Sequence, residues 1–172
     1  MSLTLIKETG AGLADANAYA DVADADAYHA GHLYASAWTA ATADQKAVAL
    51  VMASRLIDAE YQFNGTRAMV GQALQWPRAM CPGPDDSVML PADAVPKAVV
   101  QATCEMARAM LVEDRTANPL GEGLKFTGLG VNQTSFDKSD RRPVLTQLAQ
   151  VMLSKYGSQI SAKSGAVRLV RV

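Results

Sequence analysis

The sequence predicts a mainly α-helical protein, a small bundle built around one central helix at about residues 93–113. Polar side chains in this stretch recur at helical spacing and share one face, namely Lys97, Gln101, Glu105 and Arg108. Nearly every other residue in the stretch is apolar, so the helix must be covered on most sides. Hydrophobic residues make up 49% of the chain and aromatic residues only 6%, a composition that favours alanine-rich helices packed closely together.

Local signals place the ends of this helix and of its neighbours. Asp93 can cap the central helix, and Pro96 falls in the first turn, where its missing N–H would have no partner. An acidic N-terminus predicts a first helix over 21–34. The capping box at Thr42 opens a second helix that runs to about residue 63. A third helix is expected over 143–156, followed by Gly157 as its stop.

Shorter segments complete the predicted architecture. The Gly- and Pro-rich stretch 66–91 is too long for an unstructured connection and should form an ordered loop or hairpin. Residues 124–136 predict a two-stranded β-ribbon. We therefore expect a helical domain over 1–157 and an extended C-terminal arm over 158–172. The apolar end of this arm either packs on its own domain or adds to a partner, and the sequence leaves both open.

The charges of the chain are unevenly distributed. Residues 1–60 carry eight carboxylates against three basic side chains, a net charge of −5. Residues 138–172 carry seven basic side chains against one carboxylate, a net charge of +6. This asymmetry indicates a polyanionic partner for the C-terminal end, head-to-tail packing of copies, or scatter over a solvated surface. The sequence shows neither a membrane-spanning run nor a signal peptide, so we expect a protein made in a cytoplasm without membrane contact.

Catalytic and metal-binding patterns are not found in the sequence. His29 and His32 are three residues apart on the first predicted helix, after Asp24 and Asp26, but no fourth ligand is evident and surface histidines are the favoured interpretation. Cys81 and Cys104 form no CxxC pair, which favours free thiols. Phosphate-binding loops and nucleophile motifs are absent. We expect no catalytic residue, no metal and no cofactor, and hence no enzyme.

Two aromatic and basic pairs suggest single-stranded nucleic-acid binding, which needs cations and stacking platforms together. These are Trp76 with Arg78, and Phe126 with Lys125. Pro77 follows Trp76 and Leu74 precedes it, so packing of the indole in the core is the favoured interpretation. Arg78 would then anchor the loop through carbonyl groups or contact a neighbouring subunit. The sequence assigns Trp76, Pro77 and Arg78 to a loop anchor or subunit interface.

An ordered set of motifs carries a family resemblance. It comprises Glu8-x-Gly10-x-Gly12, Ala16-Asn17-Ala18-Tyr19, Val22–Tyr28, Gly65-Thr66-Arg67, Gln72-x-Leu74-x-Trp76-Pro77-Arg78, Val95-Pro96 and Ala102-x-Cys104-Glu105-x-Ala107. In these motifs the chain resembles a tailed-phage family labelled DnaT-like single-stranded-DNA-binding proteins. In layout it is also similar to the head–tail adaptors, the helical connectors beneath the phage portal. The resemblance covers residues 1–112 well and 113–142 loosely.

The adaptor resemblance implies a structural protein of the virion neck, made in the host cytoplasm. It implies a homo-oligomeric ring, usually of twelve copies, that extends the DNA channel and offers a docking platform. Its partners would be the portal protein, a downstream tail or nozzle protein, and duplex DNA passing through without sequence-specific binding. The arm that grips the portal would be Val167, Arg168, Leu169, Val170, Arg171 and Val172. The DnaT-like label implies the alternative, a phage-encoded single-stranded-DNA-binding accessory protein.

Overall fold

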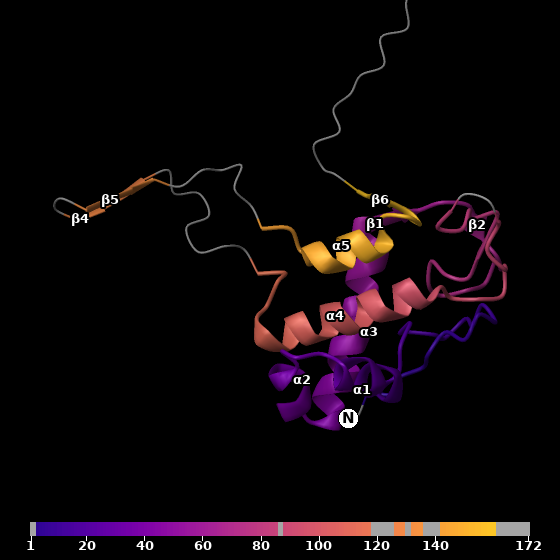
Figure 1. Cartoon of the computed structure of the whole chain (residues 1–172), viewed down its shortest axis with the longest axis horizontal. Coiled ribbons are helices and arrows are strands. Elements are labelled where there is room, and N and C mark those ends of the chain that lie inside the picture. The colour runs from indigo at the N-terminus through magenta and orange to yellow at the C-terminus, as the bar shows by residue number, and fades with distance from the viewer. Residues whose placement is uncertain (1–2, 86–87, 118–125, 130–131, 136–141, 161–172) are drawn as a thin grey trace, which may run out of the picture.

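The fold is seen in a computed structural model that describes residues 3–85, 88–117, 126–129, 132–135 and 142–160. Within these ranges the chain forms five helices and six short strands (Figure 1). None of the helices in these ranges is both long and apolar enough to cross a membrane.

The central helix, α4, spans Lys97–Val112 and packs against the other four helices. Its buried positions include Val99, Cys104 and Met106, which are fully covered by their neighbours. The prediction of a central helix is therefore confirmed. The helix begins at Lys97 because Pro96 keeps an extended backbone with ψ 140° and occupies the N-cap position, so Asp93 does not cap it.

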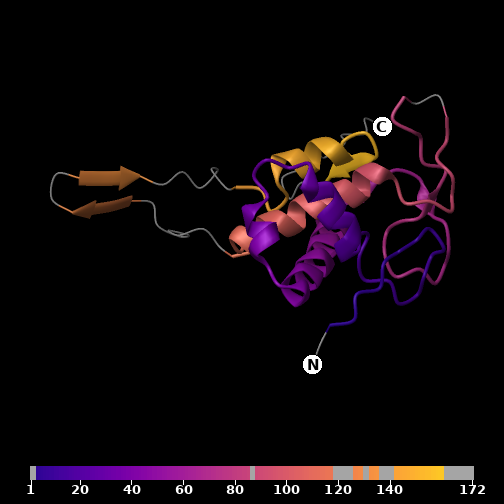
Figure 2. The same cartoon turned by 60° about the horizontal axis from the view of Figure 1, so that its bottom comes forward.

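Three helices precede α4 in the chain. Helix α1 (Val22–Ala30) begins with a capping box in which Asp21 and Asp24 exchange side-chain to backbone hydrogen bonds, and it ends at Gly31, earlier than predicted. Helix α2 (Ser36–Ala40) is a short turn that the sequence did not indicate. Helix α3 (Ala43–Glu60) starts at the predicted capping box of Thr42 and crosses α4 (Figure 2).

The expected mainly α fold class is wrong, because the helices are combined with small antiparallel sheets in a mixed α/β structure. Strand β1 (Tyr61–Phe63) pairs with β6 (Gly157–Gln159), and β2 (Thr66–Arg67) pairs with β3 (Arg78–Ala79). Each of these strands has only two or three residues, too few for an alternating pattern to stand out in the sequence.

Strands β4 (Phe126–Leu129) and β5 (Asn132–Ser135) form the predicted ribbon. The described backbone pairs Phe126 with Ser135 at one end and Leu129 with Asn132 at the other. Gly128 lies inside β4 and pairs with Gln133. The ribbon itself is confirmed.

The last helix, α5 (Gln147–Leu153), is shorter than predicted because Thr146 is its N-cap. It packs on α4, and the chain then returns as β6 alongside β1 at the end of α3. Gly157 is needed there, because a Cβ atom on it would lie 2.2 Å from the carbonyl oxygen of Gln62. The predicted arm beyond residue 160 lies outside the described residues.

Candidate nucleic-acid interface

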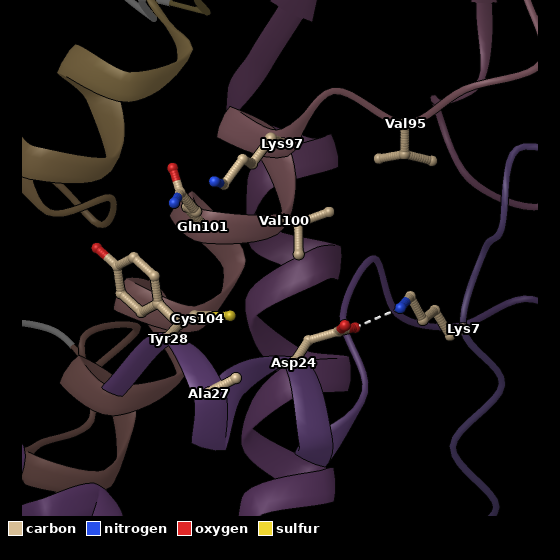
Figure 3. Close-up of a pocket in the computed structure, with 9 residues that line it drawn as sticks. All are labelled: Lys7, Asp24, Ala27, Tyr28, Val95, Lys97, Val100, Gln101 and Cys104. Atoms are coloured by element: carbon tan, nitrogen blue, oxygen red, sulfur yellow. Dashed lines mark ion pairs between the residues drawn. The ribbon is translucent and has the colours of Figure 1, made fainter. Parts of the chain in front are cut away.

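An open groove of about 600 Å³ lies between α1 and the first half of α4 (Figure 3). Its polar lining comes from three parts of the chain: the N-terminal segment, α1 and α4. The residues that supply it are Lys7, Asp24, Tyr28, Lys97 and Gln101. A volume of this size falls in the range of small-ligand sites.

The charge of Lys7 is already matched inside the groove. Its ammonium forms an ion pair with the carboxylate of Asp24 and lies 3.5 Å from Asp21. Partial burial disfavours the charged ammonium, but the hydrogen bond to Asp24 and its negative charge outweigh that effect and raise the pKa of Lys7. Lys7 and Asp24 together are therefore close to neutral, and they fasten the N-terminal segment to the start of α1.

Lys97 and Gln101 supply the remaining polar groups on the α4 side. Lys97 and Gln101 are one turn apart on α4, and both side chains line the groove (Figure 3). Lys97 is exposed and takes part in none of the ion pairs found between described residues. It is the cation in the groove whose charge is not matched there.

Beyond Gln101 on α4, the buried carboxylate of Glu105 holds the side chains around it in place. Glu105 is 1% exposed, and its Oε1 atom accepts a hydrogen bond from the Tyr28 hydroxyl at 3.0 Å and lies 3.3 Å from His32 Nε2. Its Oε2 atom accepts two hydrogen bonds from Arg108, at 2.8 and 3.2 Å. Burial and the negative charge of Glu105 raise the pKa of Tyr28 to about 12, so the phenol remains a donor.

One hydrogen bond to the ring of His32 fixes the tautomer of its neutral form. The backbone N–H of Tyr34 donates to His32 Nδ1 at 3.0 Å, which leaves the proton of the neutral ring on Nε2, where it faces Glu105. This arrangement and a long hydrogen bond from Arg108 to the Tyr34 carbonyl, at 3.4 Å, hold the turn after α1 against α4. The side chain of Tyr34 is 74% exposed and is the most exposed aromatic ring among the residues whose burial is described.

Lys97, Gln101 and Arg108 therefore form one line along α4, and the Tyr28 hydroxyl at Glu105 and the backbone of Tyr34 at Arg108 lie beside it. From Lys97 to Arg108 this line is about 16 Å long, at the rise of an α-helix. It combines cations, an amide and partly exposed aromatic rings, the residue types that bind phosphates and stack on unpaired bases. The sequence showed the polar stripe on α4, but it gave no sign that Tyr28 and Tyr34 would lie beside it.

The sequence-predicted residues Trp76, Pro77 and Arg78 lie elsewhere. Trp76 is fully buried, with its ring edge-on to Phe63 at a centroid distance of 5.5 Å. Arg78 is 5% exposed and donates to backbone carbonyls on both sides of the loop, namely those of Phe63, Asn64, Gly65 and Gln75. In this position neither side chain can reach a nucleic acid.

The other predicted positions give no DNA-binding platform. Lys125, the ring of Phe126 and the proposed portal-binding arm, 167–172, lie outside the residues whose side chains are described. The interpretation of His29 as a surface residue is wrong: it is 3% exposed, faces the Cys104 carbonyl at 3.1 Å and packs on Trp38. Burial lowers its pKa and keeps it neutral. In the described part of the chain, no three His, Cys, Asp or Glu residues are grouped to hold a metal.

The motifs that carry the family resemblance serve the fold. The carboxylate of Glu8 is buried and accepts hydrogen bonds from the backbone N–H groups of Gly10, Gly12 and Leu13 at 2.8–3.0 Å. The amide of Gln72 bonds to the carbonyls of Leu74 and Pro77. These motifs shape the long loops that lead to α1 and α4, and among their residues Asp24, Ala27, Tyr28, Val95 and Cys104 also line the groove.

Comparison with known proteins gives one match. A family model described as "Putative DnaT-like ssDNA binding protein" matches residues 3–172, almost the whole chain. No curated protein and no solved structure matches the chain.

This match corrects the head–tail adaptor interpretation, because it names single-stranded-DNA binding and supports no adaptor identity. The adaptor interpretation rested on the layout of the motifs and on the lack of an obvious base-stacking platform in the sequence. The portal, the tail proteins, the ring and the virion neck entered through that interpretation and stay predictions of the resemblance.

Proposed function

Because the chain belongs to the DnaT-like single-stranded-DNA-binding family, we propose that it is an accessory protein that binds single-stranded DNA in the groove between α1 and α4. The observation that carries the proposal is the line from Lys97 to Tyr34, which places unmatched positive charge and exposed aromatic surface on one side of the molecule. We propose a binding role without catalysis.

The two ends of the line have different roles. Lys97 lies at the groove and supplies the charge that attracts a phosphate, and the amide of Gln101 can donate to a phosphate oxygen or to a base. Tyr34 offers the face or edge of its ring to an unstacked base near the Arg108 end of the line, about 16 Å from Lys97. A base in a duplex is stacked on both sides, so this arrangement favours single strands over duplex DNA.

The local charge balance limits how tightly the DNA is held. Lys7 is paired with Asp24 and Arg108 with Glu105, which leaves Lys97 as the main net charge on this face. A contact with one or two phosphates gives a log–log salt slope of about −0.7 to −1.4 for a single strand. We therefore expect weak binding with a shallow salt dependence, as suits a protein that acts beside other DNA-binding proteins.

The experiment is a fluorescence-anisotropy titration of the full chain with a labelled oligothymidine, repeated over a series of salt concentrations. Lys97→Ala should weaken binding and flatten the salt slope, and Tyr34→Ala should weaken binding with the slope unchanged. Lys155→Ala, an exposed lysine after α5, and Leu33→Ala, an exposed apolar residue beside Tyr34, are matched controls that should bind like wild type.

Two outcomes would contradict the proposal at different levels. The absence of binding to single strands at low salt would reject the function. Binding that is unchanged in both Lys97→Ala and Tyr34→Ala would keep the function and reject the groove as its location.

A further inference from the structure

A second, apolar groove of about 320 Å³ lies between α3 and the end of α4. Its floor and walls come from Val48, Ala49, Met52, Met110 and Leu111, and Asp44 lies at its rim. Val48 is 52% exposed, and Met52, Met110 and Leu111 are only partly covered. An apolar surface of this kind on a folded domain marks a place that another segment covers.

The last seven residues of the chain have the composition of such a segment. Ala166–Val172 reads AVRLVRV, five apolar residues and two arginines. These residues lie outside the part of the chain that the structure describes, so only their sequence enters the argument. Left in water they would expose three valines and a leucine within seven positions, which is unfavourable.

Charge distinguishes this groove from its neighbour. Asp44 belongs to no ion pair between described residues, and the C-terminal end of α4 presents the negative end of the helix dipole beside Leu111. Both would attract Arg168 and Arg171. A second apolar hollow adjoins this groove along α3 and shares Val48 and Met52 with it. It also includes Arg55, whose exposed cation would repel a segment with two arginines, so the arginines are expected at the Asp44 end.

The tail is long enough to reach the groove of its own chain. The N–H of Ile160 donates to the carbonyl of Glu60 at 2.8 Å, so the described chain ends beside the last residue of α3. Met52 lies about 12 Å back along the helix axis from Glu60, and Val48 about 18 Å. Six extended residues, 161–166, span up to about 20 Å, which brings Val167 to the level of these two side chains.

From composition, charge and reach together, we propose that the segment Ala166–Val172 docks in the α3–α4 groove of its own chain. The valine and leucine side chains cover Val48, Met52 and Met110, and an arginine lies near Asp44. This contact is separate from the DNA groove between α1 and α4 and stands whether or not the protein binds DNA.

Methionine-methyl NMR tests the proposal in the intact protein. The chain has eight methionines, of which Met52 and Met110 line the groove, whereas Met69, Met80 and Met89 lie on the exposed loops between β2 and α4. In a chain that ends at residue 165, the signals of Met52 and Met110 should shift and the three loop signals should not. Unchanged signals for Met52 and Met110, or equal shifts at all sites, would overturn the proposal.

Point variants distinguish the docking from other effects of truncation. Leu169→Asp should reproduce the shifts of the truncated chain. Val48→Asp should do so as well, whereas Val151→Asp, an exposed valine on α5, should leave Met52 and Met110 as in wild type. The shifts should be independent of protein concentration. Shifts that depend on concentration and accompany a doubled mass would show the tail in a second copy, and would overturn docking in the same chain.

Discussion

The phenol of Tyr19 donates a hydrogen bond to the carboxylate of Asp58 in the interior of the protein, and the two groups together hold the loop that contains Trp76. The backbone N–H of Gln75 bonds to both the Tyr19 hydroxyl and Asp58 Oδ2, each at 3.0 Å, and the N–H of Trp76 bonds to the same hydroxyl at 3.2 Å. Residues from three distant parts of the sequence thereby meet at one point beside α3. This arrangement is unfavourable in one respect, because the buried carboxylate of Asp58 has lost much of its hydration.

This loss of hydration predicts a dependence of stability on pH. Burial raises the pKa of Asp58 to about 6 from 3.8, so between these values the folded protein keeps a proton that the unfolded chain has released. The contribution of Asp58 to the free energy of unfolding should therefore fall as pH rises from about 4 to about 6, by on the order of 3 kcal/mol, and should change no further above that range. Urea unfolding at several pH values measures it. Asp58→Asn should remove the decrease, whereas the exposed Asp44→Asn should keep it; a decrease that persists in Asp58→Asn would assign it to another group.

We expect that replacing Arg78 lowers the stability of the fold and that lysine at this position does not restore it. Arg78→Ala leaves several carbonyls of the loop without a donor, and we expect a cost of about 3 kcal/mol in the free energy of unfolding. Arg78→Lys should recover less than half of that loss, because one ammonium cannot reach carbonyls on both sides of the loop. Arg67→Ala, the exposed residue opposite Arg78 in the β2–β3 pair, should change stability by less than about 0.5 kcal/mol. Urea unfolding of the three variants measures these differences, and a full recovery in Arg78→Lys would mean that charge alone holds the loop.

The same Arg78 variants also separate fold from function. Below its unfolding temperature, Arg78→Ala should bind oligothymidine as wild type does, because Arg78 is buried away from the groove. A folded Arg78→Ala protein with strongly weakened DNA binding would show that this loop, and not the groove, contacts the DNA.

The central part of the fold was predictable because its signals are local. The sixteen residues of α4 repeat one polar stripe, and Thr42 with Gln45 forms a capping box four residues long. The β1–β6 pairing joins Tyr61 to Gln159, ninety-eight positions apart, and its strands are too short to show a period. Register over such a distance is set by tertiary packing, so the sequence predicted the helices and the 124–136 ribbon but missed the β1–β6 pairing.

The residues of the candidate site also differ in whether the sequence could reveal them. Lys97, Gln101 and Arg108 could be recognised in the sequence because they share a helix face. Tyr34 could not, since its place beside Arg108 depends on how the turn after α1 packs on α4. Trp76 and Arg78 were conspicuous in the sequence because aromatic and basic residues stand together there, but the same chemistry serves a buried loop equally well.

At Gly10, adding one methyl group should strongly lower the stability of the fold. It has φ +103°, and a Cβ atom on it would lie 2.0 Å from the carbonyl oxygen of Asp93. Gly10→Ala should therefore cost about 2 kcal/mol or more, because the loop held by Glu8 must move away from the segment that leads into α4. Gly71→Ala is the matched control, since nothing lies within 4 Å of its added Cβ atom. Thermal unfolding of the two variants compares them, and equal melting temperatures would mean that the loop yields without strain.

Substitution of Glu105 should strengthen DNA binding and lower the stability of the fold. Glu105→Gln removes the charge that neutralises Arg108 and keeps an oxygen for the Tyr28 hydroxyl. The fold should lose about 1–3 kcal/mol, because the buried network loses its charge-assisted hydrogen bonds. Arg108 then adds a net positive charge to the line between Lys97 and Tyr34, so oligothymidine should bind more tightly and the salt slope should steepen by about 0.7.

The control for this prediction is Glu60→Gln, which makes the same change in net charge at the end of α3. It should leave both the affinity and the salt slope as in wild type, because its charge lies away from the groove. Anisotropy titrations at three or more salt concentrations, below the unfolding temperature of each variant, measure both quantities. If Glu105→Gln is folded and binds with the wild-type slope, Arg108 does not face the DNA and the interface ends at Gln101.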